Sequence, residues 1–212
     1  MDERLTDLTV RRLVERLATS DPVPGGGSAA ALAGAMGAAL VRMVVELTVG
    51  RPAAEGHAEE LTDIGVAASG WQSELLNLAE LDASAYDAVV RARRLPRDSD
   101  LHKQARETQV AAAVREATRA PLATARVANE VLGLAERLAP IGNRNAISDV
   151  GVASLLAVAA IRGAAMNVEI NLPSLPEDDP LRPEARAALG SQLADLDRRE
   201  RALAAAVGDR IG

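Results

Sequence analysis

The pattern of hydrophobic and polar positions predicts helices along almost the whole chain. Between clusters of Pro and Gly, apolar residues recur every third or fourth position in segments rich in Ala and Leu. No run of β-branched residues alternates with polar ones as in a strand. The pattern predicts helices over 6–19, 28–49, 54–94, 99–119, 121–139, 145–170 and 183–208. We therefore expect an all-α fold, an up-and-down bundle of long Ala- and Gly-rich helices in one domain over residues 1–212.

The segment 54–94 has the clearest periodicity. Its apolar residues are spaced three and four apart, which predicts a coiled-coil-like seam. The seam comprises Leu61, Ile64, Ala68, Trp71, Leu75, Leu78, Asp82, Ala85 and Val89. A helix of this length extends roughly 60 Å at ~1.5 Å per residue, more than a compact domain accommodates. We expect it to bend or to pack against a second subunit.

Three other features shape the expected architecture. Pro121 separates two helical patterns, so it either kinks one long helix or begins a new one. The segment 145–170 is apolar almost all round, which predicts burial on every side and therefore a dimer interface as well as a core. The segment 173–183, with its prolines and acids, is expected to be an exposed link to the last helix.

We expect neither a membrane-spanning segment nor a secretory signal peptide in this sequence. The apolar stretches Ala29–Val41 and Val150–Ile161 are each ended by an arginine and are expected to be too short to span a bilayer. The charged beginning of the chain does not resemble a signal peptide, so the expected compartment is the cytoplasm.

Composition narrows the chemistry that this chain can perform. Hydrophobic residues make up 48% of it but aromatic residues only 1%, and it has no Cys and two His. Cysteine-based metal sites, thiol nucleophiles and sites with three His ligands in one chain are excluded. The net charge of −6 and the shortage of aromatic side chains argue against nucleic-acid binding. We expect no metal site, and the remaining catalytic groups are carboxylates, amides, hydroxyls, Arg and the backbone.

The sequence Pro24-Gly25-Gly26-Gly27-Ser28 leads directly into a predicted helix. Glycines expose backbone N–H groups at the positive end of the helix dipole, where an anion or a closely approaching planar ligand is favoured. The alternative is a flexible turn. The preceding prolines stiffen this segment, so we favour a binding role.

Two further places carry candidate acid–base groups. Asp82 lies on the apolar seam with Tyr86 one turn later, as either a buried structural pair or a carboxyl with a raised pKa suited to proton transfer. Asn143, Asn145, Ser148 and Asp149 open the most apolar helix. Helix capping explains one or two of these four side chains but not all of them.

These motifs, in their order, resemble the cyclodeaminase/cyclohydrolase family, which includes the C-terminal domain of formiminotransferase-cyclodeaminase and stand-alone methenyltetrahydrofolate cyclohydrolases. The resemblance extends over roughly residues 5–175. The motifs that carry it run from Pro22 to Ala35, from Asp82 to Pro96, from Ala120 to Leu122, from Gly142 to Ala153 and from Asn167 to Leu172.

The resemblance implies a homodimeric all-α protein with a folate site between helices near the subunit interface. It implies a tetrahydrofolate derivative as substrate and no cofactor. The composition and the short apolar stretches add that neither nucleic acid nor a membrane is an expected partner. The expected reaction is hydrolysis of 5,10-methenyltetrahydrofolate to the 10-formyl form. Asp82, Asp149 and Tyr86 are then the expected catalytic residues. The expected substrate-binding residues are Pro24, Gly25, Gly26, Gly27, Ser28, Asn143, Asn145, Ser148 and Asn167.

Two alternatives remain open at this point. A formiminotetrahydrofolate cyclodeaminase would close the same bridge and release ammonia. A helical folate-binding or scaffold dimer would catalyse nothing. Since the chain carries no formiminotransferase domain to hand on a formimino intermediate, we favour the cyclohydrolase.

Overall fold

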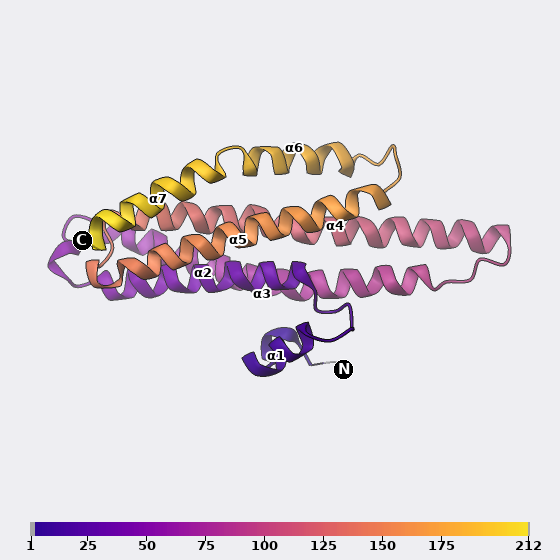
Figure 1. Ribbon diagram of the computed structural model, residues 1–212, viewed down its shortest axis with the longest axis horizontal. Helices are drawn as coiled ribbons and strands as arrows, with labels where there is room; N and C mark the ends of the chain where they lie inside the picture. The colour runs from indigo at the N-terminus through magenta and orange to yellow at the C-terminus, as the bar shows by residue number, and fades with distance from the viewer. Residues whose placement is uncertain (1–2, 212) are drawn as a thin grey trace.

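The computed structural model describes residues 3–211, and over this range the chain folds into helices without a strand. Four long helices form an antiparallel bundle in which each packs against its neighbours in chain order and the last packs against the first (Figure 1). They are α2 (Gly26–Thr48), α3 (Ala58–Arg93), α4 (Asp100–Leu138) and α5 (Ile147–Asn171). The all-α prediction and the up-and-down order are confirmed.

Small residues bring α2 and α5 close together. A Cβ built on Gly37 would lie 3.0 Å from the carbonyl oxygen of Ala153, and one on Gly163 would lie 3.2 Å from the Cβ of Ala30. The buried core therefore consists of Ala, Val, Leu and Ile side chains around backbones in near contact, which explains how the bundle packs densely with so few aromatic residues.

The seam predicted on α3 is confirmed: Leu61, Ile64, Ala68 and Leu75 are fully buried. A helix of this length fits within one chain because the molecule is elongated, and the expected contact with a second subunit stays a prediction. Figure 1 shows α3 and α4 running along its long axis and projecting beyond the other helices at one end.

Several predicted boundaries were wrong. The predicted helices 99–119 and 121–139 form one helix, α4, which continues through Pro121, so the alternative of one long helix holds. The predicted last helix is broken into α6 (Leu181–Leu193) and α7 (Leu196–Ile211), and the first is only α1 (Val10–Leu17), preceded by a short 3-10 turn, η1 (Leu5–Asp7). Three more 3-10 turns occur: η2 (Pro52–Ala54), η3 (Arg144–Ala146) and η4 (Leu172–Ser174).

The link before α6 is only partly exposed. Leu175 and Asp179 are buried. The Asp179 carboxylate accepts hydrogen bonds from Arg115 Nε at 2.6 Å and from the Leu181 N–H at 3.0 Å, so it holds the link on α4 and begins α6.

A single chain buries only part of the surface of 145–170, so the predicted dimer interface over the rest stays a prediction. One side of α5 is open, and Leu155, Met166 and Ile170 are 57%, 67% and 74% exposed. A matching stripe on α2 is exposed or half-buried beside it. We call the two stripes together the α2–α5 apolar face; it comprises Met36, Leu40, Met43, Leu47, Val152, Leu155, Met166 and Ile170.

The same two helical regions, Gly26–Thr48 and Arg144–Ser174, are long and apolar enough to cross a membrane by length and composition. The expectation that they are too short was therefore wrong, because each helix continues past the arginine that ends its apolar stretch. About half of each is buried inside the bundle, 56% and 50% respectively, as expected for core helices.

Candidate functional site

A cavity of about 240 Å³ lies where the glycine-rich beginning of α2 meets α3, α4 and α5. The backbone of three consecutive glycines forms one wall, and side chains of the other helices form the rest. The lining residues are Pro22, Val23, Gly25, Gly26, Gly27, Asp82, Ala83, Tyr86, Ala117, Asn167, Ile170 and Asn171. The cavity therefore brings the glycine motif together with Asp82 and Tyr86, which are more than fifty residues away in the sequence.

Asp82 packs directly on the first turn of α2. The Ser28 hydroxyl lies 2.9 Å from Asp82 Oδ2 and 3.0 Å from the Ala79 carbonyl oxygen. A Cβ built on Gly27 would lie 2.1 Å from Asp82 Oδ1. Gly27 is therefore required because the carboxyl group of Asp82 occupies the space of its missing side chain.

Burial raises the pKa of Asp82 above its ordinary value, and hydrogen bonds from the side chain and backbone of Ser28 offset part of this rise. The hydrogen bonds around Asp82 are compatible with both a neutral and an ionised carboxyl group. A hydroxyl has one proton, so Ser28 either donates it to the Asp82 carboxylate or donates it to Ala79 and accepts a proton from a neutral Asp82. The carboxyl group can thus gain or lose a proton without leaving a buried polar atom unpaired.

A proline in α4 shapes the opposite wall. Pro121 has no N–H, so the carbonyl of Ala117, four residues earlier, lacks its helical donor. Asn171 Nδ2 supplies the missing hydrogen bond at 2.8 Å. One turn earlier on α5, Asn167 Nδ2 donates to the Gly163 carbonyl at 2.8 Å. Both amide groups are thereby fixed at the cavity wall, with their oxygens left as acceptors.

The predicted residues divide into two groups. Gly25, Gly26, Gly27, Asn167, Asp82 and Tyr86 line the cavity, while Pro24 and Ser28 are buried and do not line it. Asn171 and Ile170 also line it and were not predicted as site residues. The spacing Asn167–Asn171 puts both amides on one helical face, so the sequence contained the signal for Asn171.

Asn143, Asn145, Ser148 and Asp149 lie elsewhere. The Asn143 N–H donates to Thr48 Oγ1 at 2.8 Å, and its Nδ2 donates to the Leu47 carbonyl at 3.0 Å, at the far end of α2 from the glycines. Its Oδ1 accepts from the Asn145 N–H at 3.0 Å, which caps η3. Ser148 is exposed and Asp149 half-buried in the first turn of α5. Since the 23 residues of α2 span roughly 35 Å, these side chains do not reach the Asp82 cavity of their own chain.

The geometry gives Gly27→Ala a specific expected effect. The new methyl group must displace the Asp82 carboxyl group, so we expect a loss of roughly tenfold to a hundredfold in kcat of the site's reaction, with the helical content unchanged. Gly70→Ala is the matched control, because a Cβ at this helical position meets nothing within 4 Å. Steady-state kinetics and circular dichroism test the pair, and equal activity of both variants would contradict the contact.

Comparison with known proteins gives consistent matches. The family model for formiminotransferase-cyclodeaminase matches residues 9–189. A methenyltetrahydrofolate cyclohydrolase of Methylorubrum extorquens is 44% identical over 167 residues, which cover 79% of this chain and 80% of that protein. The formimidoyltransferase-cyclodeaminase of Rattus norvegicus is 29% identical over 84% of this chain. The match covers 33% of the rat enzyme, so the chain corresponds to about one third of it.

The fold also matches a solved structure over nearly its full length. The crystal structure of formiminotetrahydrofolate cyclodeaminase from Thermotoga maritima superposes with a TM-score of 0.87 at 26% identity. The match covers 98% of this chain and 100% of the other.

Proposed function

The chain belongs to the formiminotransferase-cyclodeaminase family, and from this premise we propose that it hydrolyses 5,10-methenyltetrahydrofolate to 10-formyltetrahydrofolate. The observation that carries the proposal is the Asp82 carboxyl group, which lines a cavity with a glycine-backbone wall and has a raised pKa. The 44% identity to a methenyltetrahydrofolate cyclohydrolase over most of both chains supports this reaction.

The chemistry requires one proton acceptor that later becomes a donor. Asp82 accepts a proton from a water molecule while the oxygen of this water bonds to the cationic methenyl carbon. The bond from this carbon to N5 then breaks, Asp82 returns the proton to N5, and the second proton of the water is released as the formyl group forms on N10. A carboxylate also stabilises the cationic substrate, and a raised pKa makes the ionised Asp82 a stronger proton acceptor.

The other lining residues bind and orient the substrate in this proposal. The N–H groups and flat surface of Gly25–Gly27 allow a planar pterin to approach the backbone closely. The fixed amide oxygens of Asn167 and Asn171 accept hydrogen bonds from pterin N–H groups. Tyr86, 40% exposed, supplies the aromatic ring of this wall and joins Asp82 as a catalytic candidate.

The second candidate is the cyclodeaminase reaction, which the Thermotoga maritima match favours. Here Asp82 would protonate the departing nitrogen of the formimino group while N10 closes the bridge. An absorbance assay with purified protein separates the candidates. Loss of the methenyl chromophore faster than in buffer supports hydrolysis, and its appearance from 5-formiminotetrahydrofolate supports the deaminase. No change with either substrate contradicts both.

The active form in this proposal is a homodimer that buries the α2–α5 apolar face. The members of the face are all apolar, and Arg162, exposed on the same side of α5, is paired with Asp197 and Glu200 of α7. Contiguous exposed apolar patches on a protein of this size mark interaction surfaces. Its occupant is a second copy, because two stripes of aliphatic side chains and methionines are complementary to themselves, as an isologous interface requires. Ile170 belongs both to this face and to the cavity lining, so the partner subunit covers the edge of the cavity.

The orientation of the partner subunit determines which of its residues lie near the Asp82 cavity. A two-fold axis that lies in the plane of the interface and runs perpendicular to α5 makes the two copies of α5 antiparallel. The beginning of one α5 then lies beside the end of the other, near Asn167 and Ile170. In this arrangement Asn145, Ser148 and Asp149 of the partner subunit complete the site, which gives the second motif a role that its own chain cannot provide.

Charges on the face should separate the subunits. We expect Leu155→Glu to halve the mass in solution, because a buried carboxylate opposite its own copy is strongly unfavourable. Val66→Glu is the control, since Val66 is 71% exposed on α3, outside the face. Light scattering after gel filtration measures both, and a wild-type monomer or a dimeric Leu155→Glu variant would overturn the proposed interface.

A further inference from the structure

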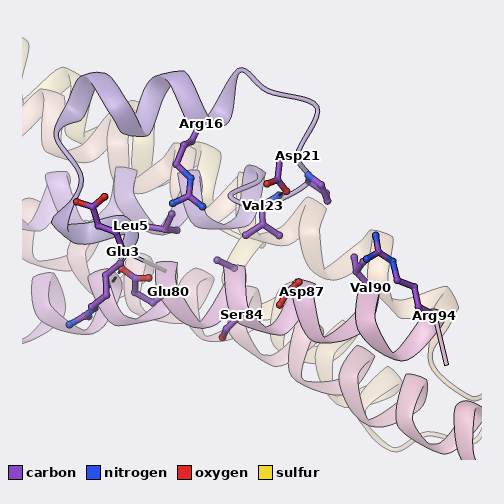
Figure 2. Close-up of a pocket in the computed structure, with 13 residues that line it drawn as sticks. Glu3, Leu5, Arg16, Asp21, Val23, Glu80, Ser84, Asp87, Val90 and Arg94 are labelled. Atoms are coloured by element: carbon purple, nitrogen blue, oxygen red, sulfur yellow. Dashed lines mark hydrogen bonds and ion pairs between the residues drawn. The ribbon is translucent and has the colours of Figure 1, made fainter. Parts of the chain in front are cut away.

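A second, larger cavity adjoins the Asp82 cavity. It has a volume of about 440 Å³ and lies between α3 and the segment that runs from η1 through α1 to Val23 (Figure 2). The two cavities share Pro22, Val23 and Ala83 in their walls, so these residues are the boundary that a ligand longer than a pterin would cross.

Four carboxylates line this outer cavity, and each already has a partner. Glu80 Oε1 accepts from the Thr6 N–H at 2.8 Å and from its hydroxyl at 2.9 Å. The other three are held by a guanidinium or a backbone N–H: Glu3 by Arg12, Asp87 by Arg91 and Asp21 by the Val23 N–H. Glu3, Glu80 and Asp87 are thus paired with the arginines Arg12, Arg4 and Arg91, whereas a backbone hydrogen bond leaves the negative charge of Asp21 in place.

Two arginines of the same cavity are not compensated. The guanidinium groups of Arg16 and Arg94 have no hydrogen bond or ion pair within residues 3–211, although both line the cavity. Figure 2 shows Arg16 reaching down from α1 toward Val23, and Arg94 reaching back along α3 toward Val90. Two free guanidiniums on opposite sides of one cavity favour a ligand with two carboxylates.

We propose that Arg16 and Arg94 bind the glutamyl carboxylates of the substrate, a site that rests on the proposed folate reaction. A tetrahydrofolate consists of a pterin, a p-aminobenzoyl ring and a glutamate with two carboxylates. With the one-carbon bridge at Asp82, the benzoyl ring passes over Val23 and Ala83. The glutamate then enters the outer cavity, where the arginines supply the only uncompensated positive charges of its described lining.

Glu80 acts in this proposal as a positioning residue. Its bonds to Thr6 and its ion pair with Arg4 Nε at 3.8 Å attach η1 to α3, with Leu5 buried beside them. This attachment places α1, and hence Arg16, over the outer cavity. Arg94 is on α3 itself and does not depend on it.

The test compares two substrates that differ only at the tail: 5,10-methenyltetrahydrofolate and 5,10-methenyltetrahydropteroate, which lacks the glutamate. We expect Arg16→Gln and Arg94→Gln each to raise KM for the folate about tenfold with kcat unchanged, since each removes a charge-assisted contact that is the same in ground and transition states. The pteroate should have a high KM in the wild type that neither variant changes.

Matched controls are Arg11→Gln on α1 and Arg93→Gln on α3, exposed arginines that do not line either cavity. Equal effects of the two cavity variants on both substrates, or an unchanged KM for the folate, would overturn the tail site while leaving the reaction intact. If the wild type turns over neither substrate, the proposed function fails. Calorimetric titration with p-aminobenzoylglutamate then tests the tail site separately, and equal binding by the wild type and the double variant would refute it.

Discussion

Replacing Asp82 with Asn is expected to lower kcat for opening of the methenyl bridge by about a thousandfold. The amide can still accept the Ser28 hydroxyl proton and fits the same space beside Gly27, so the cavity keeps its shape. It can neither take a proton from water nor return one to N5, and it no longer compensates the cationic bridge. Stopped-flow absorbance of the methenyl chromophore measures the loss. Asp63→Asn, an exposed change on the same helix, serves as the control.

The same variant has an opposite expected effect on stability. Because burial raises the pKa of Asp82 in the folded state, the folded protein binds more protons than the unfolded one between the two pKa values. The ionised carboxylate therefore lowers the free energy of unfolding at neutral pH, and this cost disappears as the pH falls through the folded pKa toward the unfolded one. Asp82→Asn should unfold at a higher temperature than the wild type at pH 7, and the difference should shrink toward pH 4. Wild-type activity in Asp82→Asn would refute the catalytic assignment.

Mixing two inactive variants is expected to restore activity. If Asp149 of the partner subunit completes each site, Asp82→Asn and Asp149→Asn homodimers both lose most of their turnover. A mixed dimer then contains one site with both aspartates intact and one with neither. Random exchange of subunits makes about half of the dimers mixed, so the mixture should reach about a quarter of wild-type activity.

This experiment distinguishes the two arrangements of the site. If both aspartates acted within one chain, every site of a mixed dimer would carry one substitution and the mixture would stay inactive. If Asp149→Asn alone kept wild-type turnover, Asp149 would have no catalytic role. Unfolding and refolding the two variants together, followed by light scattering, ensures that exchange has occurred and that the dimer has reformed.

The sequence by itself determined the helical class, the order of the long helices and half of the site. Periodic apolar positions fix which face of each helix is buried, and this local signal placed Asp82 on the seam of α3. It also singled out the three glycines at the beginning of α2, although it did not give the reason for them. That reason, the Asp82 carboxyl group in the place of a Gly27 side chain, depends on the packing of two helices far apart in the sequence.

Only the tertiary structure decided where chemically similar motifs lie relative to one another. The motif from Asn143 to Asp149 looks as functional as the glycine motif in the sequence, yet α2 separates the two by its whole length. In the sequence, Pro121 was compatible either with one kinked helix or with the beginning of a new one. In the structure, the Asn171 side-chain amide donates to the Ala117 carbonyl, which compensates the missing helical hydrogen bond and allows α4 to continue. In the outer cavity, the partners of Glu80 likewise come from a segment far away in the sequence, since Thr6 and Arg4 precede α1. Helical periodicity is a property of neighbours along the chain, whereas a site is a property of neighbours in space, and this is why the sequence predicted the helices but only part of the site.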